Sequence, residues 1–228
     1  FRINKKYSDI NFITGEKIQL LCDHNIGKIE DFNFNPRIRL LNNKSKNNRF
    51  IELGKVTKFI NNKKLVFCYT HLLNDLNLLI KTLKYLKNPF KLIFHNSDTS
   101  FNKEHLKLFN KLPLLQHIYS QNLNIVNSNI SYLPIGIANS QWVHGNLDIF
   151  KKIYNKKISK DKDIFFNFNI DTNKEKRQYC YDILSKKGLQ WTNNLDTEKY
   201  LIELKKHKYC ICPEGNGLDT HRFWECLY

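Results

Sequence analysis

The chain has 228 residues, of which 41% are hydrophobic and 13% aromatic, and it carries a formal net charge of +16 at pH 7. This is the composition of a globular protein, long enough for one large or two small domains, and it excludes a collagen-like or fibrous chain. The excess of Lys and Arg favours anionic partners, which include nucleotide sugars, acidic glycans, nucleic acid and anionic membrane surfaces.

Predicted strands and helices alternate along residues 1–150. We predict strands at residues 17–21, 49–53, 65–68, 90–94, 115–119 and 130–133, and helices at residues 72–86, 102–112 and 147–154. Alternation of this kind predicts an α/β fold, with a parallel sheet covered by helices on both faces. We therefore expect residues 1–150 to form a Rossmann-like N-terminal domain.

Polar side chains follow three of these predicted strands. The first group is Asp23 with His24, the second is Thr70 with His71, and the third is residues 95–98, from His95 to Asp98. In a parallel sheet the ligand crevice lies beyond the carboxyl ends of the strands, so the three groups are expected along one edge. Taken singly, each histidine is explained as a helix cap or a loop residue; together they suggest a site for an acceptor or a general base.

A linker at residues 151–163 and a second domain at residues 164–228 follow. We predict strands at residues 164–170, 189–191 and 209–212, and helices at residues 173–187, 198–207 and from about 221 onward. This order is half of a Rossmann-like unit. In the linker, Asp161 and Asp163 form an Asp-x-Asp pair, which we interpret as solvated charges because it precedes a strand instead of following one.

The six cysteines show no spacing typical of a zinc site, and we expect no bound metal. Cys210 and Cys212 alternate on one predicted strand and are expected to be small core residues. Reduced thiols are favoured over a disulfide framework, which favours a cytoplasmic location. The sequence has no Met and stops inside a predicted helix, so we expect a fragment with an incomplete C-terminal domain. A membrane anchor in a missing segment would bring membrane association and suit the Golgi lumen instead.

Residues 209–228 combine a strand, a glycine-rich turn and the start of a helix, which together suit a phosphate group. Gly215, Asn216 and Gly217 form the turn, and its glycines can adopt positive φ and let a ligand approach the backbone. Asp219 or Thr220 would cap the helix. The simpler interpretation of these residues is a tight turn before a capped helix.

Arg222 and Glu225 lie three residues apart in this last helix. Arg222 offers a forked, permanently charged donor for a diphosphate, and Glu225 offers an acceptor for two neighbouring ribose hydroxyls. His221 lies in the same turn as Arg222 and is a further candidate for acid–base chemistry near a leaving group. The simpler alternative is a surface ion pair, but the pattern predicts a nucleotide-diphosphate pocket.

The run Pro-x-Gly-x-Gly-x-Asp-x-x-Arg-x-x-Glu-x-Leu, which begins at Pro213, resembles the donor-site signature of exostosin-like glycosyltransferases. Weaker matches lie at residues 133–142 and at residues 166–169, with Asn173 and Arg177. The resemblance implies a GT-B enzyme with two Rossmann-like domains, metal-independent and inverting as a rule, that uses a nucleotide-diphosphate sugar. It also implies that Arg222 contacts the diphosphate and Glu225 the ribose. Glu214 departs from the pattern, since relatives often have a basic residue there.

The expected function is therefore that of a glycosyltransferase. Its co-substrate is expected to be a nucleotide-diphosphate sugar, with a UDP-sugar as the first candidate, and no further cofactor is expected. The N-terminal domain would present a glycan or other hydroxyl acceptor, and Asp98 or His95, with Asp23 behind them, would take the acceptor proton. Two alternatives stay open: a basic nucleic-acid- or glycan-binding module without catalysis, and a nucleotide-sugar epimerase of the same fold. Nucleic acid is the weaker partner, because the aromatic residues mostly occupy apolar strands and helix faces.

Overall fold

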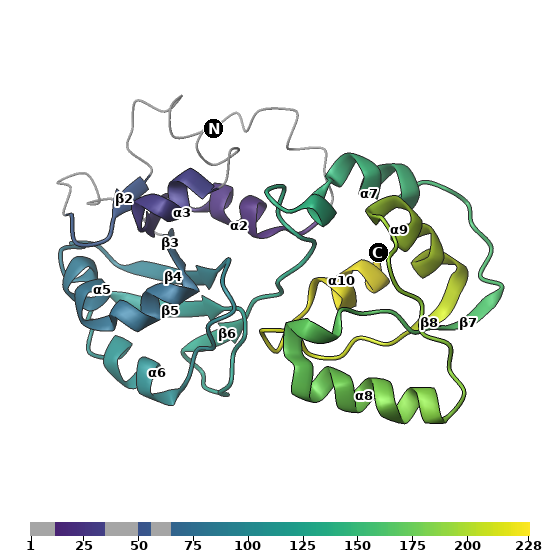
Figure 1. Cartoon of the computed structure of the whole chain (residues 1–228). Coiled ribbons are helices and arrows are strands. Elements are labelled where there is room, and N and C mark those ends of the chain that lie inside the picture. Colours follow the sequence, from purple (N-terminus) through teal and green to yellow (C-terminus); the bar gives the residue numbers. More distant parts are fainter. Residues whose placement is uncertain (1–11, 35–49, 56–64) are drawn as a thin grey trace.

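The computed structural model describes residues 12–34, 50–55 and 65–228, and it contains two separate parallel sheets with helices around each (Figure 1). The part around the larger sheet is called the first unit, and the part around the smaller sheet the second unit. Residue 49 of the strand predicted at 49–53 lies outside the described residues.

The first unit is built on a sheet with the strand order β2-β1-β3-β4-β5-β6, and every neighbouring pair is parallel. Its strands are β1 (His24–Gly27), β2 (Phe50–Glu52), β3 (Leu65–Tyr69), β4 (Phe90–His95), β5 (Leu115–Ser120) and β6 (Ile130–Tyr132). Its helices are α2 (Gly15–Leu21), α3 (Ile29–Phe34), η1 (Thr70–Asp75), α5 (Leu76–Leu83) and α6 (Lys103–Phe109). The predicted α/β class and parallel sheet are confirmed.

The strand order of this sheet reverses between β1 and β3. Connections that run in opposite directions from this point place helices on both faces, and Figure 1 shows α2 and α3 on one side of the sheet with α5 and α6 on the other. The core between these layers includes Val66 and Phe67 of β3 and Phe94 of β4, which are fully buried. Loops diverge at such a reversal and leave a crevice beyond the carboxyl ends of the strands.

The second unit contains two parallel strands, β7 (Lys162–Phe165) and β8 (His207–Cys210). Its helices are η2 (Val143–Gly145), α7 (Leu147–Tyr154), η3 (Ile170–Asn173), α8 (Lys174–Lys186), α9 (Thr197–Lys206) and α10 (His221–Leu227). Asn146, Asn173 and Asp196 each accept a backbone N–H from the first turn of α7, α8 and α9, which explains where these three helices begin. Each described helix is too short or too polar to cross a membrane.

The core of the second unit takes residues from both ends of the chain. Phe12 and Ile137 cluster there with Phe150 of α7, Phe165 of β7 and residues of α9. The ring of Phe12 packs edge-on against Phe150, with 4.8 Å between ring centroids, and against Tyr228, with 4.9 Å. Helix α7 therefore packs with the second sheet, while the predicted domain limits at 150 and 163 stay a prediction.

Residues 17–21 belong to helix α2, so the strand predicted there is wrong. The Thr14 hydroxyl caps this helix by accepting the backbone N–H of Lys17 at 3.1 Å. Ile18 and Cys22, one turn apart, are both buried, whereas Leu21 is 58% exposed. A short apolar run fits the period of a strand or of a helix, and here the cap favours the helix. The first strand is therefore β1, which begins at His24.

The strand predictions in the second unit are also wrong in part. Residues 189–191 form no strand, and Trp191 instead packs edge-on against Tyr181. Strand β7 ends at Phe165, because the next residues bury Phe166 and Phe168 while the backbone turns toward η3. The strand predicted at 209–212 is β8, which ends at Cys210, and it is only partly buried.

Candidate functional site

A cavity of about 280 Å³ lies beyond the carboxyl ends of β3, β4 and β5, where the two units meet. The first unit lines it with residues at or just after the ends of these strands, including His71, His95, Asp98 and Gln121. The second unit contributes His221, the first residue of α10. The volume is close to about 300 Å³, the lower end of the range for small-molecule pockets. The cavity thus lies at the predicted edge of the sheet.

His95 ends β4 and is only 1% exposed. Its Nε2 donates a hydrogen bond to the carbonyl oxygen of Pro134 at 3.0 Å, and its Nδ1 lies 2.8 Å from Oδ1 of Asn96. Burial lowers the pKa of His95, because the charged ring would lose its hydration, although the two hydrogen bonds partly oppose this. Both ring nitrogens have protein partners, so His95 attaches the segment around Pro134 to the sheet and keeps no nitrogen for a substrate proton.

His221 has a different arrangement. Its Nδ1 lies 2.7 Å from the carbonyl oxygen of Gly136, and since a carbonyl only accepts, Nδ1 carries the proton. In the neutral ring Nε2 is then an acceptor, and no group in the described part of the chain is bonded to it. His144 lies beside it, with 6.2 Å between ring centroids. His221 can therefore accept a proton in this cavity, as can Nδ1 of His71, whose Nε2 faces the Asp31 carboxylate.

The three predicted carboxylate and histidine groups do not all gather at this edge. Asp98 lines the cavity, is exposed, and accepts no hydrogen bond from a described residue. His71 also lines it, with its Nε2 lying 3.2 Å from Oδ2 of Asp31. Asp23 precedes β1 and accepts the backbone N–H of Leu65 at 3.0 Å, at the start of β3. The prediction that Asp23 lies at a carboxyl end is wrong, because the strand assumed before it is a helix.

Polar residues outside the predicted set also shape the cavity. Glu16 of α2 accepts the backbone N–H of Ser140 at 2.9 Å and also its hydroxyl. Asn139, which lines the cavity, accepts the backbone N–H of Glu16 at 2.9 Å. These bonds hold the segment of residues 134–142 against the start of α2. The sequence carried one signal for them, namely Thr14, whose hydroxyl marks the beginning of that helix.

The segment after β8 is held by two residues of the neighbouring helix α8 and its cap. Arg177 donates to three backbone carbonyls, those of Glu214 at 2.8 Å, Pro213 at 3.3 Å and Asn169 at 2.7 Å. Asn173 donates to the carbonyl oxygen of Gly215 at 2.9 Å. Asn173 and Arg177 therefore fix the shape of the glycine-rich segment. The side chain of Glu214 pairs with that of Lys176 at the surface.

The two glycines of this segment serve close packing rather than a left-handed backbone. Positive φ occurs among the described glycines at Gly54, Gly136 and Gly188. At Gly217 a Cβ atom would lie 2.5 Å from the Asn122 side chain, and at Gly215 it would lie 3.1 Å from Arg177. Asn216, between them, is exposed. The segment thus lies directly against the first unit at Asn122.

Asp219 connects the two units. Its Oδ2 accepts the backbone N–H of Ile135 at 2.7 Å and the hydroxyl of Tyr132, and its Oδ1 accepts the indole N–H of Trp224 at 2.8 Å. Its own backbone N–H donates to Asn122 at 3.1 Å. Thr220 is the N-cap of α10, but its side chain makes no capping hydrogen bond. Asp219 is thus already engaged with protein donors on both oxygens.

Arg222 and Glu225 share one face of α10, as their spacing predicts. The Arg222 guanidinium lies over the ring of Tyr200, 4.9 Å from its centroid, and its Nη2 donates to Oδ1 of Asn167 at 3.0 Å. The Tyr200 hydroxyl donates to Oε2 of Glu225 at 2.7 Å. Nη1 of Arg222 is buried and has no hydrogen-bond partner among the described residues. The structure therefore brings Arg222 and Glu225 together around Tyr200 and leaves one guanidinium donor unused.

In the described residues, one group of His, Cys, Asp or Glu side chains is compact enough to share a metal ion, and it consists of Cys210, Cys212 and Cys226. None of these belongs to the predicted site. A scan against models of known protein families finds no match for this chain, and a search of curated proteins finds no significant match either. Any function of the chain must therefore be argued from its own residues and their geometry.

Proposed function

We propose that this chain is a glycosyltransferase of GT-B type, which moves a sugar from a nucleotide-diphosphate sugar to a hydroxyl of a glycan or related acceptor. One observation carries the proposal. Two adjacent residues of α10 face different surroundings: His221 lines the cavity of the first unit, and Arg222 reaches into the second unit with an unpaired donor. Neighbouring helical residues project about 100° apart, so one helix can serve the acceptor and the donor at once.

Arg222 is the proposed contact for the diphosphate. A guanidinium binds phosphate oxygens through pairs of N–H groups. A buried N–H donor without an acceptor costs free energy, and a ligand oxygen that accepts its hydrogen bond removes this cost. Asn167 already fixes the orientation of the guanidinium through Nη2. Glu225, held by Tyr200, stays the proposed ribose contact, since Oε1 takes part in no hydrogen bond with a described residue.

His221 is the proposed general base, and Asp98 is the second candidate across the same cavity. In a direct displacement, the acceptor oxygen attacks the anomeric carbon, the bond from that carbon to the diphosphate breaks, and the hydroxyl proton passes to Nε2 of His221. The diphosphate leaves with the bonding electron pair, and the positive charge of Arg222 stabilises it. The Gly136 carbonyl accepts a hydrogen bond from Nδ1–H of His221 and so stabilises the imidazolium that forms.

The free thiols of all six cysteines suit a reducing compartment, and we place the reaction there. The net charge of +16 would draw anionic nucleotide sugars toward the chain.

Calorimetric titration with UDP, GDP and ADP tests the donor site. We expect one diphosphate to bind the wild type and Arg222→Ala to weaken this binding at least ten-fold. Lys199→Ala, which removes an exposed cation of the same unit, should leave it unchanged. If none of the three nucleotides binds to the folded chain, the assignment of Arg222 and Glu225 to a donor site is wrong.

Transfer kinetics with the nucleotide sugar so identified test the base. His221→Gln should lower kcat about 100-fold or more with little change in KM for the donor, because general-base catalysis contributes roughly that much. His144→Gln, at the neighbouring histidine, should keep kcat within a few-fold of the wild type. Equal losses in the two variants would exclude His221 as the base and leave Asp98→Asn as the next variant to measure.

A further inference from the structure

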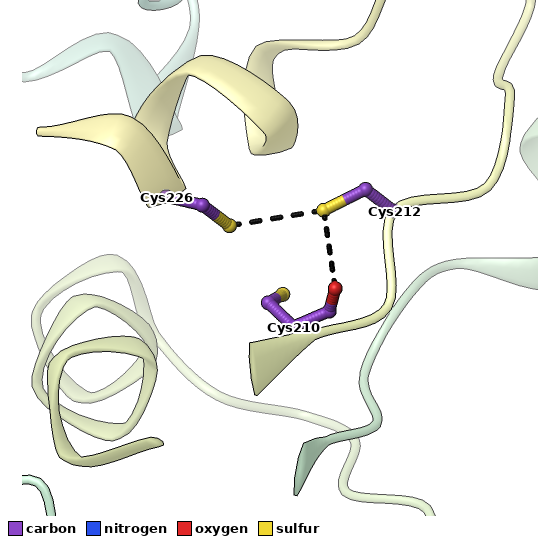
Figure 2. A group of neighbouring side chains, drawn as sticks. All are labelled: Cys210, Cys212 and Cys226. Atoms are coloured by element: carbon purple, nitrogen blue, oxygen red, sulfur yellow. Dashed lines mark hydrogen bonds between the residues drawn. The ribbon is translucent and has the colours of Figure 1, made fainter. Parts of the chain in front are cut away.

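We propose that Cys210, Cys212 and Cys226 form a binding site for a single thiophilic metal ion, with zinc as the physiological class of ligand. The three residues come from the end of β8, from the segment after it and from α10 (Figure 2). Their sulfur atoms all lie within 4.8 Å of one another. The metal takes no part in the proposed sugar transfer, although Arg222 lies near both sites.

The geometry of the three sulfurs fits a metal better than a disulfide. The Sγ atoms of Cys212 and Cys226 are 3.7 Å apart. Two thiolates bound to one tetrahedral zinc at about 2.3 Å lie roughly 3.8 Å from each other, whereas the sulfurs of a disulfide are bonded at about 2.05 Å. The wild-type arrangement therefore has a sulfur–sulfur spacing that zinc can use without large movement of the backbone.

The surroundings of the sulfurs balance the charge of such a site. Zinc with three thiolates carries a net charge of −1, and the guanidinium of Arg222 lies close enough to Cys210 to stabilise its thiolate. A guanidinium has five N–H donors, so Arg222 can face the thiolates and a diphosphate at once. Binding releases the remaining thiol protons to water.

A metal can reach the three sulfurs from the surface. Cys210 and Cys226 line a cavity of about 140 Å³ beside α9, and Cys212 lines a second one of about 260 Å³. Within the described residues the group has no fourth side-chain ligand, so water from one of these cavities would complete the coordination. Soft thiolate ligands select zinc or similar d¹⁰ ions over magnesium or calcium.

The site would cross-link both ends of the glycine-rich segment. Cys210 and Cys212 precede Gly215 and Gly217, and Cys226 follows Arg222 on α10. A bound ion thus holds the end of β8 and α10 together, which is why its expected effect is on stability. The spacing of these three cysteines in the sequence does not indicate a metal site, because the third ligand comes from a helix beyond the glycine-rich segment.

Zinc titration of the reduced chain against a chromophoric chelator tests the proposal. We expect one Zn²⁺ per chain, protection of three thiols from a thiol reagent, and a raised Tm. Co²⁺ at the same site should give a thiolate-to-cobalt charge-transfer band that added Zn²⁺ abolishes. Cys226→Ser and Cys212→Ala should each weaken zinc binding at least ten-fold, whereas Cys180→Ser, at a partly exposed cysteine of α8, should leave it unchanged.

Circular dichroism of the metal-free variants separates loss of the site from loss of the fold, and either cysteine variant suffices if the other fails to fold. The proposal is overturned if the reduced wild type takes up no zinc. It is also overturned if Cys180→Ser weakens binding as much as Cys226→Ser does. A chain that forms a Cys212–Cys226 disulfide in air, and takes up no zinc after reduction, would show a redox pair in place of a metal site.

Discussion

At the scale of single residues, Asp219 connects the two units through hydrogen bonds. Its two carboxylate oxygens serve donors from the first unit, at Tyr132 and Ile135, and from α10, at Trp224. A sequence motif shows that an Asp is present, but it does not show which donors surround it. Of the two residues predicted to cap α10, Asp219 and Thr220, it is Thr220 that occupies the cap position.

Replacing Asp219 by Ala should destabilise the protein by about 2–3 kcal/mol, because three donors lose a charged acceptor at a partly buried position. Urea unfolding measures the change in free energy of unfolding. Asp161→Ala is the control, since this exposed carboxylate precedes β7 and its removal should change stability by no more than about 0.5 kcal/mol. Similar effects of both substitutions would mean that the hydrogen bonds of Asp219 do not form in solution.

His95 gives stability a pH dependence. Its pKa in the folded chain is lowered by burial below the ordinary value of 6.5, so the unfolded chain binds this proton more tightly. The charges that face it are those of His221 and Asp219. Its contribution is therefore fully present above about pH 6.5 and is lost as the pH falls below that value.

The free energy of unfolding, measured from pH 8 to pH 5, should therefore fall more steeply for the wild type than for His95→Gln. The substitution removes the titrating group but keeps a polar side chain that can still donate to Pro134. If the two pH profiles run parallel, His95 does not titrate differently in the folded and unfolded chains.

At the scale of elements, the contact of α8 with the glycine-rich segment is made largely by one arginine. Arg177 is buried and bonded to three backbone carbonyls of Asn169, Pro213 and Glu214. Its neighbour Lys176 makes an exposed ion pair with the Glu214 side chain. The two residues thus differ in burial and in the kind of group they bond, although both are cations on one helix.

Arg177→Ala should destabilise the protein by about 2–4 kcal/mol, since it leaves three backbone carbonyls without their charged donor, and should speed amide exchange at residues 214–217. Lys176→Ala should change stability by less than about 1 kcal/mol, as is usual for surface ion pairs. Hydrogen exchange followed by mass spectrometry measures the local effect. Exchange at these residues that is the same in both variants would contradict the role of Arg177.

The elements with strong periodic signals were predictable, and those with short apolar runs were not. Strands β3 and β4 and helix α7 lie within one or two residues of their predicted limits, because each is a buried run or an amphipathic helix bounded by a cap. Residues 17–21 were too short to reveal their period. Because these residues form a helix, Asp23 lies at the amino edge of the sheet, away from the cavity, and not at the carboxyl edge where it was predicted. The groups at the ends of β3 and β4 lie at the predicted edge.

The predicted site was limited in the same way. Proximity along the helix correctly placed Arg222 beside Glu225, and the strand-end rule placed Asp98 at the cavity. Contacts between distant segments carry no local signal, so the bonds of His95 to Pro134 and of His221 to Gly136 could not be predicted. Because of these bonds, both ring nitrogens of His95 have protein partners, whereas His221 keeps one nitrogen that can accept a proton.

At the scale of the whole molecule, the second unit depends on residues that precede it. Among the described residues, five of the eight buried residues in the cluster around Phe12 come before β7, namely Phe12, Ile137, Leu147, Phe150 and Ile153, and three come from β7 and α9, namely Phe165, Leu201 and Leu204. Burial of an aromatic or branched side chain contributes about 1.5–3 kcal/mol, so the later residues alone bury too little apolar surface for an independent core.

Residues 164–228, expressed alone, should therefore fail to fold cooperatively, whereas the whole chain should show a single sharp urea transition. Near-UV circular dichroism of the aromatic residues provides the measurement, with tryptophan fluorescence as a second signal. In the whole chain, Phe12→Ala should lower stability by about 3–5 kcal/mol, as expected for a buried phenylalanine. A cooperative transition of the isolated segment would show that it is an autonomous domain.

The hydrogen bond from the backbone of Ile13 to the hydroxyl of Tyr228 spans 215 residues of sequence, and it lies beside the packed rings of Phe12 and Tyr228. Contacts between such distant positions raise the contact order. Proteins rich in them fold slowly, because the entropy cost of closing a long loop comes before the contact can stabilise the chain. We therefore expect the first sheet to fold early, through its successive parallel strands. The second core would then close as a late kinetic step, limited by the contact of Phe12 with Tyr228.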